Sequence, residues 1–147
     1  MRLSLFDLAV MPGVLFLLAS CSPGPQKEDL QHLPGYWEIT EVVFPDGTDK
    51  EYKVSTTIEY LQWDGTSGYR KKMQPTLDGT YLTSDDALPM QVIWRDDRIF
   101  LKFKGTEDTW EEEILRIEAG KLIMRHGNGL KYIYQKYEPM KIEKDNV

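Results

Sequence analysis

The chain has 147 residues, of which 41% are hydrophobic and 29% are charged, and its formal net charge is −6. This length suits one domain with a hydrophobic core of its own. The acidic balance argues against a nucleic-acid-binding protein, because such proteins usually present a basic face.

The amino-terminal segment, residues 1–20, has the composition of a secretory signal peptide. Arg2 precedes a mostly apolar stretch from Leu8 to Ala19, which is too short for a comfortable membrane span. Cys21 follows it and is the sole cysteine of the chain, which excludes an internal disulfide and a zinc site built on several cysteines. We expect residues 1–20 to be cleaved off. The alternative is an uncleaved helix that ends in a buried cysteine.

The segment after the signal peptide reads as a linker. Residues 21–32 contain two prolines, one glycine and mixed charges, a composition that buries little apolar surface. We therefore predict a flexible tether there, which spaces a single domain over residues 33–138 from a membrane. Residues 139–147 are predicted to form a charged C-terminal tail.

Alternating apolar and polar residues between turn signals predict β-strands along the domain. Pro45-Asp46-Gly47 and Asp64-Gly65 mark turns, because proline presets φ and glycine accepts a positive φ. The expected strands cover about residues 36–44, 56–63, 69–74, 80–83, 90–94, 99–103, 122–126 and 130–137.

The segment from Asp108 to Ala119 is ambiguous. Asp108 and Glu111 resemble a helix capping box, whereas the short length and the strand hairpins on both sides favour a strand. If it is a strand, the run Glu111–Glu113 is expected to be a solvated edge that discourages edge pairing. The strands then number about eight or nine and leave no room for crossover helices. We therefore predict an all-β fold, a single antiparallel up-and-down β-barrel of eight to nine strands.

Two short motifs carry a family resemblance. Gly35-Tyr36-Trp37, at the start of the first expected strand, resembles the Gly-x-Trp signature of the lipocalin family. Leu18-Ala19-Ser20-Cys21 resembles the lipobox of bacterial lipoproteins, and Tyr134-Gln135-Lys136 resembles the last strand of small lipocalin-like lipoproteins. The chain is therefore similar to a bacterial lipocalin-like lipoprotein with a lipobox signal peptide.

The resemblance implies a location and a barrel floor. Cys21 would carry acyl chains, palmitate among them, and would anchor the protein in a membrane. Ser22, in place of an aspartate, implies the outer membrane of a Gram-negative bacterium, on its periplasmic face or at the cell surface. In lipocalins an arginine of the last strand stacks on the tryptophan. Here that strand offers Lys131 and Lys136, and Arg125 lies one strand earlier.

The candidate ligand-binding residues follow from the first strand. If Trp37 points into the barrel, a period of two places Ile39, Glu41 and Val43 inside as well. Glu41 is then a polar anchor for a ligand, or else a residue near the wet mouth or paired with a lysine. Aromatic rings elsewhere either line a pocket for lipophilic cargo or fill the core. The proposed lining is Trp37, Ile39, Glu41, Tyr60, Trp94, Leu101 and Tyr134.

Catalytic and metal-binding patterns find little support in the sequence. His32 precedes the expected barrel and His126 lies at a hairpin end, so no histidine pair offers a metal site or a nucleophile with its base. Asp85-Asp86 and Asp96-Asp97 could recruit Ca²⁺, but turn chemistry accounts for both pairs. We expect no catalytic residue, metal or cofactor; an enzyme would need a cluster of titratable groups at the barrel mouth.

Two hypotheses for the function remain. The first is a membrane-anchored lipoprotein that binds or carries a small hydrophobic ligand inside the barrel. The alternative is a non-enzymatic envelope lipoprotein with a filled barrel, which acts by protein–protein interaction through its outer surface.

Overall fold

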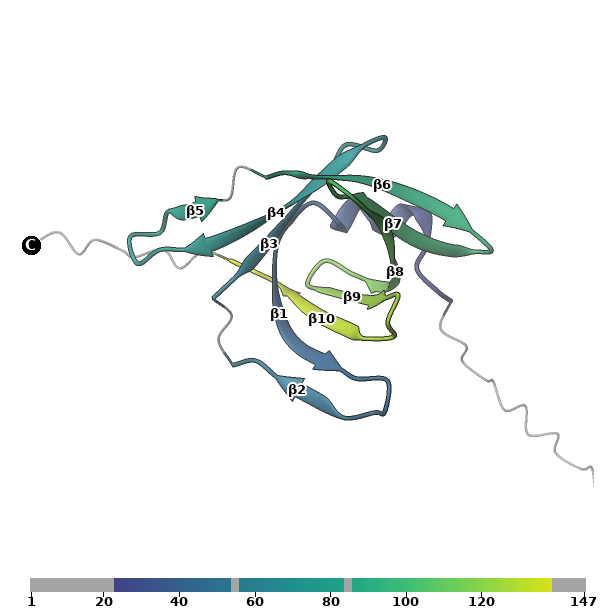
Figure 1. Ribbon diagram of the computed structural model, residues 1–147, viewed down its shortest axis with the longest axis horizontal. Helices are drawn as coiled ribbons and strands as arrows, with labels where there is room; N and C mark the ends of the chain where they lie inside the picture. The colour runs from purple at the N-terminus through teal and green to yellow at the C-terminus, as the bar shows by residue number, and fades with distance from the viewer. Residues whose placement is uncertain (1–22, 54–55, 84–85, 139–147) are drawn as a thin grey trace, which may run out of the picture.

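The computed structural model describes residues 23–53, 56–83 and 86–138 (Figure 1). The predicted signal peptide, Cys21, Asp85 and the predicted C-terminal tail lie outside the described residues. Within the described ranges, none of the helical structure has the length and apolar character that a membrane crossing needs.

The described residues form ten antiparallel β-strands and one short 3₁₀ helix, labelled η1. Their bounds are η1 Lys27–His32, β1 Gly35–Val43, β2 Asp49–Glu51, β3 Ile58–Trp63, β4 Gly68–Pro75, β5 Tyr81–Thr83, β6 Leu88–Arg95, β7 Arg98–Lys104, β8 Thr109–Ile117, β9 Lys121–His126 and β10 Lys131–Lys136. Eight of the strands close into a barrel in the order β1, β3, β4, β6, β7, β8, β9 and β10, because β10 pairs back onto β1. The predicted all-β barrel is confirmed.

The two remaining strands extend the sheet beyond the barrel. β2 pairs with the second half of β1, and β5 pairs with the second half of β4 (Figure 1). The sequence analysis did not predict β2. The ambiguous segment 108–119 contains strand β8, which pairs along its length with β7 and β9.

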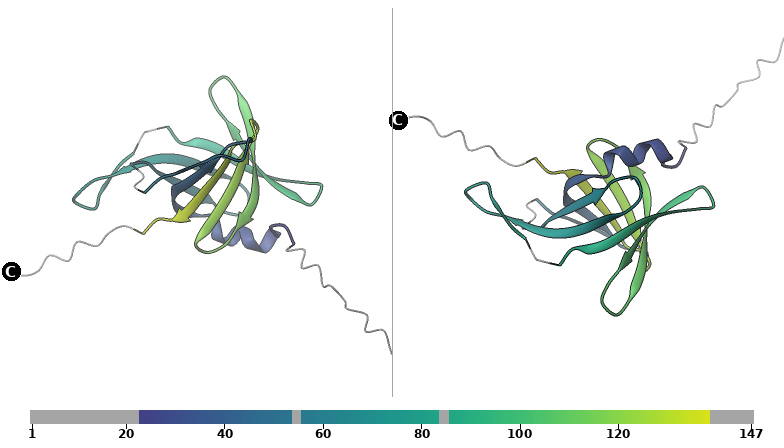
Figure 2. Two further views of the ribbon diagram at one scale, coloured as in Figure 1. Left: turned by 90° about the horizontal axis from the view of Figure 1, so that it is seen from below. Right: turned by 90° about the horizontal axis from the view of Figure 1, so that it is seen from above.

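Helix η1 corrects the predicted tether. Residues 27–32 were expected to belong to a flexible linker, but they form η1, which lies across one end of the barrel (Figure 2). Leu30 is 1% exposed and Leu33, just after the helix, is fully buried. Two isolated leucines in a polar stretch thus close the barrel, since burying each of them is favourable by about 1.5–3 kcal/mol.

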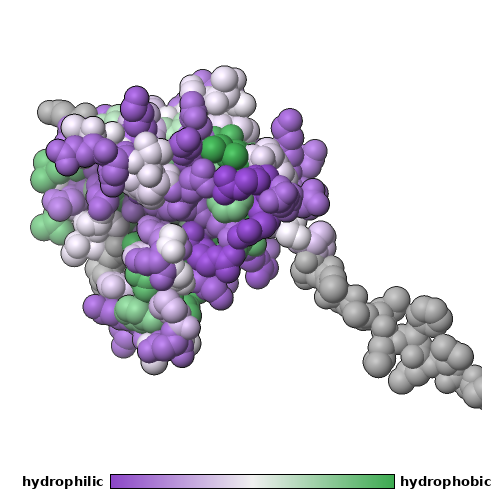
Figure 3. All heavy atoms as spheres, turned by 45° about the vertical axis from the view of Figure 1, so that its right-hand side comes forward, coloured by the Kyte–Doolittle hydropathy of each residue, from purple (hydrophilic) through white to green (hydrophobic). Residues whose placement is uncertain are grey.

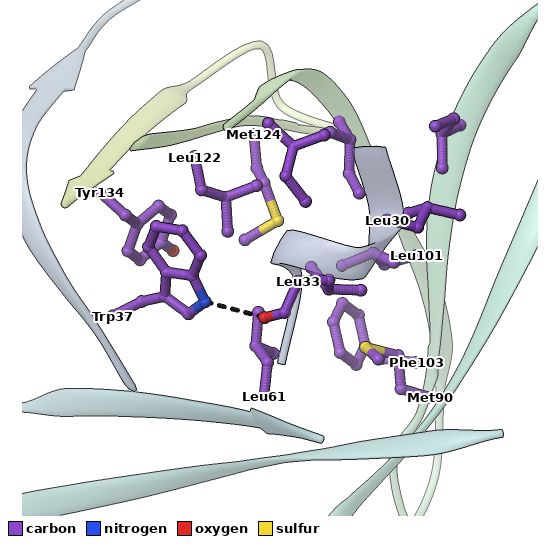
Figure 4. Packing of buried hydrophobic residues seen from close by; sticks show 13 residues of the cluster. Leu30, Leu33, Trp37, Leu61, Met90, Leu101, Phe103, Leu122, Met124 and Tyr134 are labelled. Atoms are coloured by element: carbon purple, nitrogen blue, oxygen red, sulfur yellow. Dashed lines mark hydrogen bonds between the residues drawn. The ribbon is translucent and has the colours of Figure 1, made fainter. Parts of the chain in front are cut away.

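The hydrophobic core fills the barrel beside η1. Figure 4 shows side chains from η1 and from facing strands pointing toward one another. Trp37 is fully buried, and its Nε1 donates a hydrogen bond of 2.9 Å to the backbone oxygen of Leu33. The tryptophan of the Gly-x-Trp motif therefore holds β1 to the residue that follows η1.

A lysine takes the position over the tryptophan for which the sequence offered several cations. Lys136 Nζ lies 4.2 Å from the centroid of the Trp37 ring and donates hydrogen bonds to the backbone oxygens of His32 (3.1 Å) and Pro34 (2.6 Å). A Cβ atom at Gly35 would lie 2.7 Å from Lys136 Nζ, and Gly35 has a φ of +130°. The glycine of the motif therefore allows both the local backbone and the approach of the lysine.

The direction of the strands defines two ends of the barrel. Because β1 begins beside η1 and neighbouring strands are antiparallel, the β3–β4, β6–β7 and β8–β9 turns lie at the η1 end. The β7–β8 and β9–β10 turns lie at the opposite end, which we call the mouth.

Candidate ligand-binding site

A β-bulge in β1 changes which side chains face the barrel interior. Ile39 pairs with Tyr134, whereas Glu41 pairs with Ile133, so the register shifts at Thr40. After the bulge Val42, 6% exposed, pairs with Tyr132 on the inner side. The prediction that Glu41 points inward is therefore wrong, and so is the same prediction for Val43, because strict alternation ends at the bulge.

Four of the other predicted lining residues face the interior, within the core or packed against it. Leu101 and Tyr134 belong to the buried cluster together with Trp37, and Ile39 packs against it. These side chains form the floor and walls beside η1.

Two predicted lining residues lie elsewhere. Tyr60 is on the outer face of β3, where its ring centroid is 4.8 Å from that of Tyr36 and 6.1 Å from that of Tyr69. Trp94 is 41% exposed, beside the β6–β7 turn at the η1 end and away from the mouth. The placement of Tyr60 among the lining residues is wrong, because β3 turns its other face inward, with Glu59 opposite Trp37.

A group of charged side chains lies inside the barrel toward the mouth. We call Glu59, Arg70, Glu112 and His126, which come from β3, β4, β8 and β9, the polar cluster. Arg70 Nη1 lies 3.1 Å from both carboxylate oxygens of Glu112 and 3.7 Å from Glu59 Oε2. Its guanidinium carbon is 4.0 Å from the centroid of the Phe103 ring, so the apolar core packs directly beneath the charge.

Glu112 is the most fully paired member of the polar cluster. Besides Arg70, Trp110 Nε1 donates a hydrogen bond of 3.0 Å to Glu112 Oε1, and His126 Nε2 lies 3.3 Å from Oε2. Burial by itself would raise the pKa of Glu112, but His126, Arg70 and Trp110 together outweigh it and hold that pKa below its usual value. Glu112 is therefore a carboxylate held in its charged form.

The pKa of Glu59 is shifted in the opposite direction from that of Glu112. Burial raises the pKa of Glu59, and the charges of Arg70 and Lys72 offset this only in part. The same burial, with the two carboxylates nearby, raises the pKa of Tyr134 well above its usual range. Glu59 is thus a buried acid without the set of partners that Glu112 has.

Several buried polar atoms facing the interior have no hydrogen-bond partner. They are Glu59 Oε2, His126 Nε2 and Trp63 Nε1. The contact of His126 with Glu112 is close, but its geometry leaves Nε2 without a hydrogen bond. Buried polar groups are nearly always paired, so these three unpaired atoms mark the part of the interior where a polar partner is missing.

The sequence analysis did not single out the polar cluster. It treated Glu111–Glu113 as a solvated edge, but β8 is an interior strand on which Glu112 is fully buried and Glu113 is buried as well. The signal that could have found Glu112 is the alternation of Trp110, Glu112 and Ile114, which share one face of β8.

A second charged cluster lies on the outer surface. Glu113 accepts two hydrogen bonds of 2.6 Å from Arg98 and others from Arg125, and the Arg98 and Arg95 guanidinium groups lie over the Phe100 ring. Arg98, Phe100, Glu113 and Arg125 border a hollow of about 320 Å³. Because the carboxylates there already pair with the arginines, we interpret this cluster as ion pairs that stabilise the outer face of the sheet. On the face in Figure 3, hydrophobic residues lie in separate groups among hydrophilic ones.

Metal binding has no structural support in the ranges 23–53, 56–83 and 86–138. No three carboxylate, histidine or cysteine side chains gather there in a way that could hold an ion. Asp96 and Asp97 take positive φ values of 53° and 57° in the turn between β6 and β7, as a tight two-residue hairpin turn requires.

Comparisons with known proteins give a fold likeness and no family. No family model and no curated protein matches the sequence. Among solved structures, the chain is similar to a lipocalin-like protein from Bacteroides uniformis, with 16% identity and a TM-score of 0.48 over 72% of this chain and 99% of that one. It is also similar to a protein from Bacteroides eggerthii (14% identity, TM-score 0.47, 71% of this chain and 99% of that one). A third similar structure is lobster apocrustacyanin A1 (10% identity, TM-score 0.47, 80% of this chain and 68% of that one). The closed barrel itself rests on the strand pairing of this chain.

Proposed function

We propose that this chain is a membrane-anchored binding protein that carries a small hydrophobic ligand in the mouth half of its barrel. The observation that carries the proposal is the polar cluster with its unpaired atoms, next to inward-facing Ile39, Val42 and Tyr132. A barrel that only fills itself would be at least as stable with apolar side chains at these positions. An apolar wall with a few convergent polar groups is the usual make-up of a ligand site.

The binding proposal is tested by native mass spectrometry of residues 22–147, which contain the whole described sheet and core. We expect one small apolar molecule to be retained per chain, or one fluorescent apolar probe to bind per chain in solution. A chain that retains nothing and binds no apolar probe would contradict the carrier role.

The anchor is a separate part of the proposal. We infer that Cys21 is acylated after cleavage of residues 1–20 and holds the protein at the outer membrane, on either face. The lipobox-like Leu18-Ala19-Ser20-Cys21 and the apolar stretch before it support this. Growth with labelled palmitate should label the wild type and leave Cys21→Ala unlabelled; equal labelling of the two would refute the anchor.

The alternative function, docking through the outer surface, is favoured by one observation. Five tyrosines form a chain of ring contacts on the outer face around β1, β3, β4 and β5, namely Tyr36, Tyr60, Tyr69, Tyr81 and Tyr137. Close by, Leu77 and Leu82 of the β4–β5 hairpin are exposed. In this case Leu77→Ser with Leu82→Ser would abolish capture of a protein partner and leave probe binding in the barrel unchanged.

A further inference from the structure

We propose that the polar cluster makes this site selective for a lipophilic amine, whose ammonium group binds Glu59 while its apolar tail lies along the inner wall. The inference rests on the proposed carrier function and adds the chemical class of the ligand.

Glu59 is the acceptor that the geometry leaves open. It is 9% exposed on the inner face of β3, directly across from Trp37, and its Oε2 has no hydrogen-bond partner. Its contact with Arg70 is 3.7 Å, whereas both oxygens of Glu112 lie 3.1 Å from the same nitrogen. An ammonium group brings three N–H donors, so it would satisfy this oxygen once the side chains around it move apart to admit a ligand.

The charges of the polar cluster favour a cation over an anion. Arg70 is within ion-pair distance of two carboxylates and lies closer to Glu112, so an ionised Glu59 has no cation at close range of its own. A fatty-acid carboxylate would add a third carboxylate to this group. Like charges placed together in a low-dielectric interior repel strongly, and opposite charges attract.

The wall beside Glu59 suits the rest of such a ligand. Ile39 and Val42 present apolar side chains from β1, and Tyr132 from β10 packs its ring 4.1 Å from that of His126. Aromatic faces near a cationic group add cation–π attraction. The site therefore combines an apolar surface for a tail with a carboxylate and aromatic rings for an ammonium head.

The groups that face Glu59 set how it titrates. They are Arg70 and Lys72 from β4, Glu112 from β8, His126 from β9, and Tyr132 and Tyr134 from β10. Burial outweighs the two cations and raises the pKa of Glu59. An arriving ammonium favours the charged carboxylate, so binding of an amine lowers the pKa of Glu59 from its raised value.

The test is calorimetric titration of residues 22–147 with three probes of equal chain length: octylamine, octanol and octanoate. Near neutral pH we expect octylamine to bind about 10- to 100-fold more tightly than octanol, since a hydrogen bond to a charged group contributes that much. Octanoate should bind more weakly than octanol. Octylamine titrations from acidic to neutral pH, in buffers of different ionisation enthalpy, should report a released proton wherever unliganded Glu59 is protonated.

Two isosteric variants locate the effect. Glu59→Gln should bring octylamine to within a few-fold of octanol and leave octanol binding unchanged. Glu41→Gln, the same chemical change on the outward side of the bulge, should behave as wild type. Circular dichroism checks that both variants keep the barrel, and the three-probe comparison on the wild type needs no variant at all.

The possible outcomes separate this inference from the function on which it rests. If octanol and octylamine bind equally, or octanoate binds most tightly, the amine selectivity is wrong and the carrier function stands. If none of the three binds, and no apolar probe binds either, the carrier function itself fails.

Discussion

Arg70 and Glu112 are 42 residues apart in the chain and lie on strands that do not pair, yet their side chains meet inside the barrel. The guanidinium bridges the interior between β4 and β8, with Glu59 of β3 beside it. Such a contact forms only when the barrel is closed. The buried ion pair therefore depends on the closure of the sheet into a barrel.

The first prediction concerns this bridge. Arg70→Leu leaves Glu59 and Glu112 buried without their cation, so it should lower the free energy of unfolding by about 3–5 kcal/mol in urea denaturation. The control is Arg116→Leu, because Arg116 pairs with Glu118 on the exposed surface and should cost less than about 1 kcal/mol. Similar losses in the two variants would mean that the bridge contributes no more than a surface pair.

The second prediction concerns η1. Leu30→Ala should lower the free energy of unfolding by about 2–5 kcal/mol, as expected for a buried leucine whose removal leaves a cavity. Leu77, which is 96% exposed at the tip of the β4–β5 hairpin, is the matched control, and Leu77→Ala should change stability by less than about 0.5 kcal/mol. Were residues 27–32 a mere tether, the two substitutions would be equally harmless.

Sequence patterns predicted the strands well because turn chemistry is local. Pro45-Asp46-Gly47, Asp64-Gly65 and the paired aspartates Asp96-Asp97 mark reversals that the structure contains, with positive φ at Gly47, Gly65 and both aspartates. The antiparallel order of the barrel strands follows from such signals, whereas the short strand β2 was not predicted. Helix η1 was missed because Leu30 and Leu33 are single apolar residues in a polar stretch, and what buries them is the distant end of the barrel.

The candidate site was harder to predict, because it depends on which face of each strand turns inward. In β3 both faces carry apolar residues, with Ile58 and Tyr60 on one and Leu61 on the other, so alternation does not choose between them. In β1 a single extra residue at Thr40 reverses the pattern, which moves Glu41 outward. The sequence offers the right residue types, but the register that gathers them is a property of the closed sheet.

The third prediction concerns the floor of the barrel. Lys136→Met keeps the length of the side chain but removes two hydrogen bonds to backbone oxygens and the cation over Trp37. We expect a loss of about 1–3 kcal/mol in the free energy of unfolding. The tryptophan fluorescence of the folded state should change as well, because Trp37 is one of the four tryptophans that contribute to it. Lys131→Met, at an exposed position of the same strand, is the control and should alter neither. An unchanged stability in Lys136→Met would show that an apolar chain closes the floor equally well.

The last prediction is a pH dependence that originates in Glu59. Because burial raises the pKa of Glu59 in the folded protein above its usual value of 4.5, the folded state holds that proton more tightly than the unfolded state does. The contribution of Glu59 to stability is therefore most favourable below pH 4.5, and it is lost as the pH rises from there through the raised pKa.

Glu59→Gln lacks this titration, so the stability of this variant relative to wild type should improve as the pH rises over that interval. Glu112, whose pKa is lowered, acts in the opposite direction and lends stability that is lost as the pH falls below 4.5 in both proteins. Urea denaturation of wild type, Glu59→Gln and Glu41→Gln across acidic to neutral pH measures the difference directly. Parallel curves for wild type and Glu59→Gln would mean that Glu59 titrates in the folded protein as it does in the unfolded chain, and that burial does not govern its charge.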